Sequence, residues 1–94
     1  MNRQEMLLSQ LAEECGELIQ CVGKIHRFGI DDTHPETGKS NKEELHKGMV
    51  DVMALVEMVR VEIDGKFEDV VDYILFAEET TGKILEKQYK GFAR

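Results

Sequence analysis

Residues 7–25 read LLSQLAEECGELIQCVGKI, and this stretch decides the fold. Its apolar residues recur three and four positions apart, the spacing that places them on one face of an α-helix. No proline interrupts the pattern, and Gly29 follows it as a stop signal. We therefore expect a first helix from about Gln4 to about Arg27, with an apolar stripe formed by Leu7, Leu8, Leu11, Cys15, Leu18, Ile19, Val22 and Ile25.

The segment that follows, residues 29–40 (GIDDTHPETGKS), is rich in turn-forming residues and holds the only proline of the chain, Pro35. This composition predicts a loop. Loops of this length are uncommon inside a small domain and often carry function.

A second helix is expected from Asn41 to about Asp64, where Asp64-Gly65 ends it. Asn41 is followed three residues later by Glu44, a spacing close to a capping box, so Asn41 is a candidate helix cap. The helix is apolar nearly all round, which predicts that it is central or lies at a subunit interface. Its apolar residues are Leu45, Met49, Val50, Val52, Met53, Leu55, Val56, Met58, Val59 and Val61.

A third helix is expected from about Lys66 to about Gln88 or Tyr89. Its first turn is acidic and its last turns are basic, which suits the helix dipole. No segment alternates as a strand does, and no repeat is present. The chain is therefore predicted to be all-α, a single domain over residues 1–94.

Composition excludes several classes of function. The 94 residues include 12 Lys and Arg against 19 Asp and Glu, a net charge of −7, which argues against DNA, RNA or an anionic membrane as partner. A phosphate compound would need a cation to mediate its binding. The chain has no apolar run near the roughly 18 residues of a membrane span. Cys15 and Cys21 match no metal or redox spacing, so a cytoplasmic protein with free thiols is expected.

Acidic residues gather in Leu11-Ala-Glu-Glu-Cys-Gly-Glu-Leu18. Glu14 and Glu17 are three apart and share one flank of the helix with Lys24, whereas Glu13 points further towards solvent. Like charges at this spacing destabilise a bare helix by a few tenths of a kcal/mol, and a bound cation would reverse that penalty. Oxygen ligands of this kind suit Mg²⁺. The alternative is a solvated acidic face.

The second helix carries one aspartate, Asp51, inside the otherwise apolar run Met49-Val-Asp-Val-Met-Ala-Leu-Val56. A charge in apolar surroundings is costly unless it is paired. Asp51 is therefore either a ligand or one partner of an ion pair with Lys47, one turn earlier.

Together these features resemble the MazG-like all-α nucleoside triphosphate pyrophosphohydrolases, in the small single-domain form found in bacteria and their phages. The resemblance rests on EExxE, on Lys24-Ile-His-Arg-Phe-Gly29, on the proline-containing loop with Asn41, and on Asp51-Val-Met-Ala-Leu-Val-Glu57. It covers about the first two-thirds of the chain and implies hydrolysis of an NTP or dNTP to the monophosphate and pyrophosphate, in the cytoplasm of a bacterium or of a phage-infected host.

The resemblance also implies roles for individual residues. Mg²⁺, or Mn²⁺ in its place, would be held by Glu14, Glu17 and Asp51, while Glu13 would help to bind metal or orient water. Lys24 and Arg27 would contact phosphates, and Asn41 would contact the nucleotide. A homodimer or tetramer is expected, with the first two helices packed in a four-helix-bundle core.

One position departs from the family's pattern. The ExxD glutamate should lie three residues before Asp51, where this chain has Gly48. A glycine in mid-helix costs roughly 1 kcal/mol relative to alanine, and the sequence offers no folding reason for it. Glu44 or Glu78 could replace the missing carboxylate, or the protein could hydrolyse with fewer ligands. It could also bind a nucleotide without cutting it, or be a helical adaptor that binds none.

Overall fold

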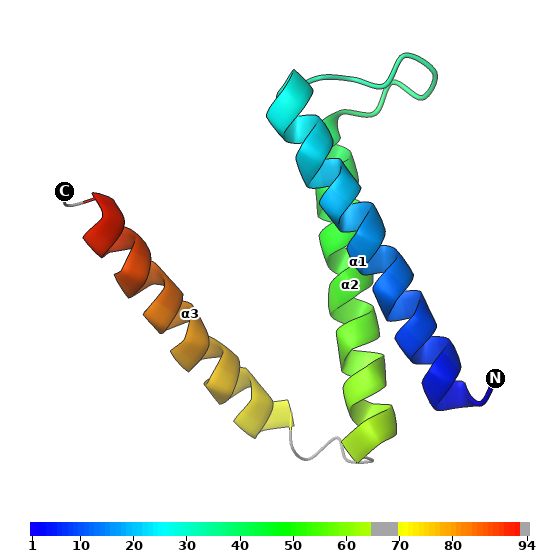
Figure 1. Cartoon of the computed structure of the whole chain (residues 1–94), viewed down its shortest axis with the longest axis vertical. Helices are drawn as coiled ribbons and strands as arrows, with labels where there is room; N and C mark the ends of the chain where they lie inside the picture. Colours follow the sequence, from blue (N-terminus) through cyan, green and yellow to red (C-terminus); the bar gives the residue numbers. More distant parts are fainter. Residues whose placement is uncertain (65–69, 93–94) are drawn as a thin grey trace. The chain divides into compact units, whose positions relative to one another are not determined.

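The computed structural model describes residues 1–64 and 70–92 of the chain. Over these residues it is all-helical, and its only β pairing is an isolated bridge between Thr33 and Ser40 (Figure 1). The all-α class and the three helices are therefore confirmed. The helices are α1 (Arg3–Phe28), α2 (Asn41–Asp64) and α3 (Val70–Phe92).

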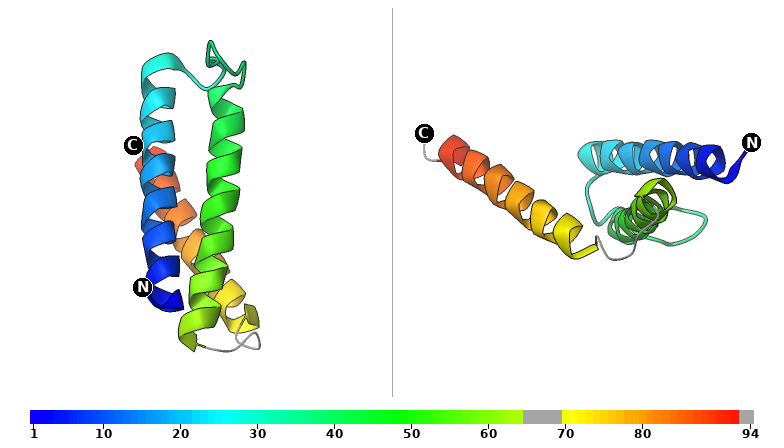
Figure 2. Two further views of the ribbon diagram at one scale, coloured as in Figure 1. Left: turned by 90° about the vertical axis from the view of Figure 1, so that its right-hand side faces the viewer. Right: turned by 90° about the horizontal axis from the view of Figure 1, so that it is seen from below.

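The chain divides into two units, Met1–Asp64 and Gly65–Arg94. The first unit is a hairpin in which α1 and α2 lie side by side and run antiparallel (Figure 2). The single domain expected over residues 1–94 stays a prediction.

Local signals explain where α1 begins and ends. The side-chain oxygen of Asn2 accepts a hydrogen bond of 2.8 Å from the backbone N–H of Glu5, which caps the first turn. At the other end Gly29 has a φ of 93° and donates its N–H to the carbonyl of Ile25 at 2.8 Å. A side chain at that φ would be strained, so glycine suits this stop. The observed bounds of α1 and α2 lie within about one residue of those expected.

The hairpin buries few side chains within this one chain. Leu7 and Val59 are buried, and so is Arg60, which donates to Glu57 at 2.6 Å. This hydrogen bond lowers the pKa of Glu57. In contrast, Val50 and Met53 on α2 are 63% and 70% exposed. α2 is therefore not buried on several sides in the isolated chain, and its expected place at a subunit interface stays a prediction.

Polar contacts hold both ends of the hairpin. Arg3 near the start of α1 donates to Glu62 near the end of α2 at 3.0 Å. At the loop end the buried Asn41 donates its side-chain N–H to the carbonyl of Gly29 at 2.9 Å, and its backbone N–H to Asp32 at 2.9 Å. These bonds fasten the start of α2 to the chain that leaves α1.

The second unit contains α3, which continues about three residues beyond the expected end, to Phe92. Its expected beginning at Lys66 and the acidic first turn lie outside the described residues. Glu79 and Lys83 form an exposed ion pair of 3.5 Å, and Leu75, Ile84 and Leu85 are exposed. None of the described helices combines the length and the apolar character that crossing a membrane requires.

Candidate functional site

A pocket of about 730 Å³ lies in the first unit, between α1, the 29–40 loop and α2. This volume falls in the range of small-molecule sites. Of the metal- and nucleotide-binding residues that the resemblance implies, those that line the pocket are Glu14, Glu17, Lys24, Asn41 and Asp51. Glu13 and Arg27 are exposed and lie outside its lining.

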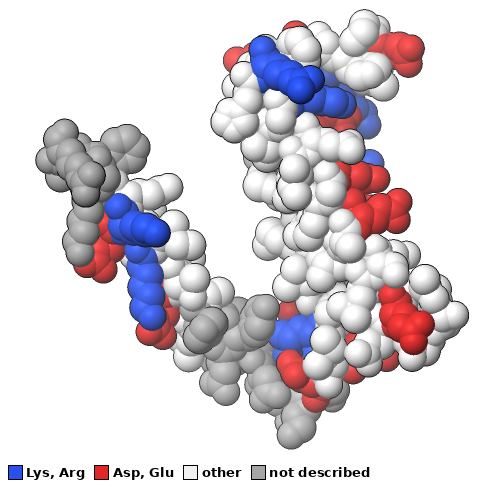
Figure 3. All heavy atoms as spheres, viewed as in Figure 1, with Lys and Arg blue, Asp and Glu red and all other residues white. Residues whose placement is uncertain are grey.

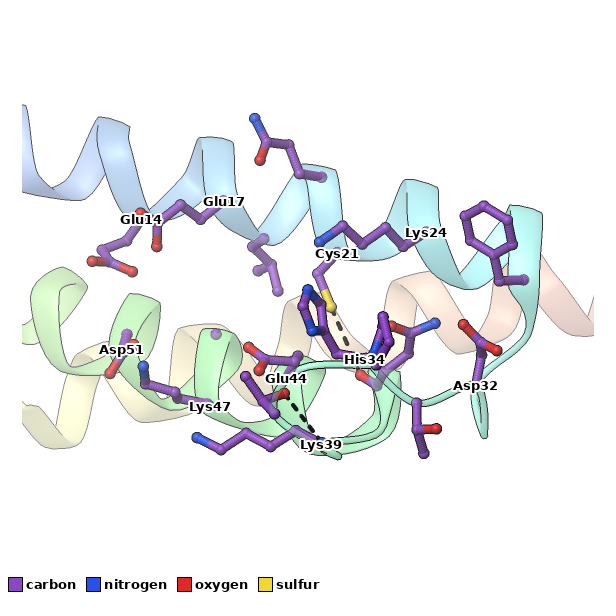
Figure 4. A pocket seen from close by; sticks show the side chains of 18 residues that line it. Glu14, Glu17, Cys21, Lys24, Asp32, His34, Lys39, Glu44, Lys47 and Asp51 are labelled. Atoms are coloured by element: carbon purple, nitrogen blue, oxygen red, sulfur yellow. Dashed lines mark hydrogen bonds between the residues drawn. The ribbon is translucent and has the colours of Figure 1, made fainter.

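Three carboxylates line one end of this pocket. Glu14 and Glu17 come from α1 and Asp51 from the facing side of α2 (Figure 4). Desolvation is the largest of the effects that raise the pKa of Glu14. Repulsion from Glu17 and a hydrogen bond with Glu17 raise it further, and repulsion from Asp51 and Glu13 makes smaller contributions. The raised pKa means that desolvation and the neighbouring carboxylates both oppose a negative charge on Glu14.

The chemistry of the donors suits Mg²⁺, because all three are carboxylates, the hard oxygen ligands that this ion takes. In the described part of the chain, however, no three His, Cys, Asp or Glu side chains are grouped closely enough to hold a metal ion by themselves. Mg²⁺ does not require such a cage, since it is commonly bound by one or two carboxylates together with phosphates and water. The donor set therefore fits a cation that arrives with a phosphate ligand.

The alternative explanation of Asp51 was an ion pair with Lys47. Both residues line the pocket and lie near one another (Figure 4), but among the described residues they form no ion pair. Asp51 is half-buried in the pocket wall and has no ion-pair partner among the described residues. This leaves the carboxylate available to a ligand.

The structure shows what lies beside Gly48, while the expectation that folding gains nothing from this glycine stays untested. A Cβ built on Gly48 would lie 3.1 Å from Cδ1 of Leu18, a side chain of α1. The glycine therefore admits Leu18 against the backbone of α2. Of the two carboxylates considered as replacements, Glu44 lines the pocket and Glu78 is an exposed residue of α3 in the other unit.

The role of Asn41 also differs from the expected helix cap. Ser40 directly precedes α2, and its Oγ accepts the backbone N–H of Glu43 at 3.2 Å, so Ser40 is the cap. Asn41 instead lies buried in the joint between the loop and α1. It still lines the pocket, and its contact with a nucleotide stays a prediction.

The loop forms a small hairpin that adds residues to the pocket which the sequence alone did not single out. His34 donates its backbone N–H to Lys39 at 2.8 Å, and Gly38, with a φ of 73°, donates to His34 at 2.8 Å. A further bond of 3.2 Å joins the Glu36 N–H to Nδ1 of His34. His34 and Lys39 line the pocket, as does Lys47 of α2. In the sequence, the signal that could have indicated this loop hairpin was the pair of turn residues Pro35 and Gly38.

Charge is divided along the first unit. On the face drawn in Figure 3, acidic side chains gather midway along the hairpin, and basic side chains lie between them and the loop end. The lysines that line the pocket come from α1, the loop and α2, namely Lys24, Lys39 and Lys47. Carboxylates and ammonium groups in one pocket are the partners that a cation-bound anion requires.

Comparison of the chain with protein-family models, with curated proteins and with solved structures finds no match. The resemblance to the MazG-like family therefore rests on the quoted residues alone.

Proposed function

We propose that this chain binds a nucleoside triphosphate together with Mg²⁺, or Mn²⁺, and hydrolyses it to the monophosphate and pyrophosphate. The observation that carries the proposal is that Glu14, Glu17 and Asp51 line one pocket of about 730 Å³, together with three lysines. After desolvation, repulsion from Glu17 and Asp51 contributes to the raised pKa of Glu14, and this repulsive part is what a bound cation would relieve.

In this proposal Glu14, Glu17 and Asp51 hold the cation, which when bound supplies charge neutralisation on the phosphate and a water activated at neutral pH. Lys24 contacts the phosphates from the same pocket. Asn41 and the loop face the nucleoside end. Glu13 and Arg27 lie outside the pocket lining, so their roles, in orienting water and in binding phosphate, rest on the resemblance alone.

A second candidate is a protein that binds a nucleotide without cutting it. Gly48 favours this candidate, since it stands where the family has a metal-binding glutamate and Leu18 occupies the space beside it. Glu44 is the carboxylate of the pocket wall that could compensate. The two candidates share the same site and differ only in turnover.

Assembly is part of the proposal. A homodimer or tetramer would cover the apolar side chains that the single chain exposes, among them Ile19, Val50 and Met53 at 72%, 63% and 70%. The net charge of −7 argues against a nucleic-acid polymer or an anionic membrane as partner. The cytoplasm is the compartment we propose.

The test is incubation of the purified protein with Mg²⁺ and each common ribo- and deoxynucleoside triphosphate, with detection of monophosphate and pyrophosphate. Glu17→Gln and Asp51→Asn should each lower turnover by at least about 100-fold if they hold the metal, because removing a ligand removes charge stabilisation in the transition state. Glu43→Gln is the matched control, an exposed glutamate of α2 outside the pocket lining. Undiminished turnover in both pocket variants would refute the assignment.

The same experiment separates the candidates when it includes Gly48→Glu. Product from the wild type means that the site works without the family's glutamate. Product from the variant alone means that the wild type binds rather than cuts. If no nucleotide changes the melting temperature with Mg²⁺ present, the helical adaptor is favoured.

A further inference from the structure

The three lysines of the pocket come from three separate segments of the chain. Lys24 lies on α1, Lys39 on the loop hairpin and Lys47 on α2. In Figure 4 each of the three side chains extends from its backbone toward the end of the pocket that holds Glu14 and Asp51. Among the described residues none of the three takes part in an ion pair. The three ammonium groups thus extend along the pocket and take part in none of the ion pairs that stabilise the described part of the chain.

The start of α2 cannot bind an anion in place of these lysines, although it lies at the same pocket. Its first backbone N–H groups are already engaged: Asn41 donates to Asp32, Lys42 to Ile30 and Glu43 to the hydroxyl of Ser40. The start of α2 therefore offers an anion no free donor at these three positions, and the positive charge of the pocket comes from its lysine side chains.

The carboxylates of the pocket oppose such an anion. Five of them line it, Glu14, Glu17, Asp32, Glu44 and Asp51, against three lysines. With every carboxylate ionised, the pocket as a whole repels a bare polyphosphate, despite its ammonium groups. A divalent cation, or the loss of two carboxylates, brings the formal charge of the pocket from −2 to zero and so removes the net repulsion.

We propose that Lys24, Lys39 and Lys47 form a polyphosphate subsite, and that the carboxylates of the same pocket prevent its occupation until their charge is neutralised. That the natural ligand is the phosphate chain of a nucleotide rests on the proposed function, whereas the binding of an inorganic polyphosphate does not. The subsite selects for the length of the phosphate chain, since a triphosphate can meet more of the lysines than a monophosphate can.

The test uses inorganic tripolyphosphate, with binding measured by calorimetry at low salt and in the presence of EDTA. The wild-type protein should bind it only when Mg²⁺ replaces EDTA. The double variant Glu17→Gln/Asp51→Asn should bind it in EDTA, because two of the opposing charges are gone. Binding should weaken as salt is added, since the contacts are exposed ion pairs.

Lysine variants made in that double-variant background identify the subsite. Lys39→Gln and Lys47→Gln should each weaken metal-free binding about fivefold, the loss typical of one exposed ion pair. Lys42→Gln is the matched control, because Lys42 is exposed and lies outside the pocket lining. Circular dichroism verifies that each variant is folded.

Failure of the double variant to bind tripolyphosphate in EDTA would overturn the subsite. Equal losses of tripolyphosphate affinity in Lys39→Gln, Lys47→Gln and Lys42→Gln would also overturn it. Neither result depends on turnover, so they are distinct from a failure of the hydrolase proposal. A protein that binds tripolyphosphate as described but releases no pyrophosphate from any nucleotide would keep the subsite and refute the hydrolase.

Discussion

Leu18 of α1 packs onto Gly48 of α2 so closely that a Cβ at position 48 would lie 3.1 Å from Cδ1 of Leu18. Contacts this short are rare for real Cβ atoms, so any larger residue at position 48 must displace the leucine by a few tenths of an ångström. Gly48 stands where the family has a metal-binding glutamate. The same glycine leaves room for Leu18 of α1 against α2, beside the pocket.

This packing makes a prediction for a double-mutant cycle. Gly48→Ala gains helix propensity of about 1 kcal/mol but meets Leu18. After Leu18→Ala has cleared the space, the same substitution should stabilise the hairpin by about 1 kcal/mol. We therefore expect Gly48→Ala to be more favourable in the Leu18→Ala background than in the wild type, as measured by urea unfolding. If Gly48→Ala changed the free energy of unfolding equally in the two backgrounds, the contact with Leu18 would not be what disfavours a side chain at position 48.

A second prediction concerns the pH dependence of stability. Because the pKa of Glu14 is raised in the folded protein, the folded state binds the proton more tightly than the unfolded state does. Glu14 therefore lowers stability at pH values above its folded pKa, and this effect disappears below the ordinary pKa of a glutamate. Glu14→Gln should raise the melting temperature at pH 7, and the gain should shrink as the pH falls towards about 4.

Mg²⁺ supplies the control for this prediction. If the cation binds beside Glu14, millimolar Mg²⁺ should raise the melting temperature of the wild type more than that of Glu14→Gln. The matched variant Glu43→Gln, outside the pocket lining, should follow the wild type at every pH and in Mg²⁺. If Glu14→Gln raised the melting temperature by the same amount at every pH, the gain would not come from the raised pKa of Glu14.

The sequence was sufficient for the helices because the signals that define them are local. The three- and four-residue spacing from Leu7 to Ile25 predicts one face of α1, and Gly29 stops the helix through its own φ of 93°. The grouping of Glu14, Glu17 and Asp51 came from the family resemblance, and in the structure all three line the same pocket.

What the sequence did not predict depends on contacts between distant segments. The packing of Leu18 on Gly48 requires the register of α1 against α2, which no local pattern contains. Likewise Lys39 reaches the pocket because the loop folds back as a hairpin, through the His34–Lys39 bond of 2.8 Å. Asn41 was interpreted as a cap because the residue type suits one, whereas the adjacent Ser40 performs that role.

A third prediction follows from the burial of Asn41. Its side chain donates to the carbonyl of Gly29 at 2.9 Å, which joins the two ends of the loop. Asn41→Ala would leave that carbonyl without this donor, so the free energy of unfolding should fall by about 1–3 kcal/mol. Lys42→Ala, at the next position and exposed, should change it by less than about 0.5 kcal/mol. If both substitutions lowered the free energy of unfolding in urea equally, the hydrogen bond between Asn41 and Gly29 would not be what stabilises the two ends of the loop.

The last prediction concerns assembly. Met53 lies three residues after Val50 and four after Met49, so it neighbours both on the surface of α2, and Met49, Val50 and Met53 are 37%, 63% and 70% exposed. Apolar side chains at this exposure favour association, and a chain of 94 residues has little core of its own. We expect a dimer or tetramer by light scattering at micromolar concentration. Met53→Glu should raise the dissociation constant at least about tenfold, because a glutamate left unpaired in an apolar contact costs more than 1.4 kcal/mol.

His46→Glu is the matched control for this substitution, since it adds a glutamate at an exposed position of the same helix outside the pocket lining. It should leave the assembly intact, which separates the loss of an apolar contact from the added negative charge. A wild type that remains monomeric at micromolar concentration would remove assembly from the proposal. It would leave the pocket unaffected, because every residue that lines the pocket belongs to the first unit of a single chain.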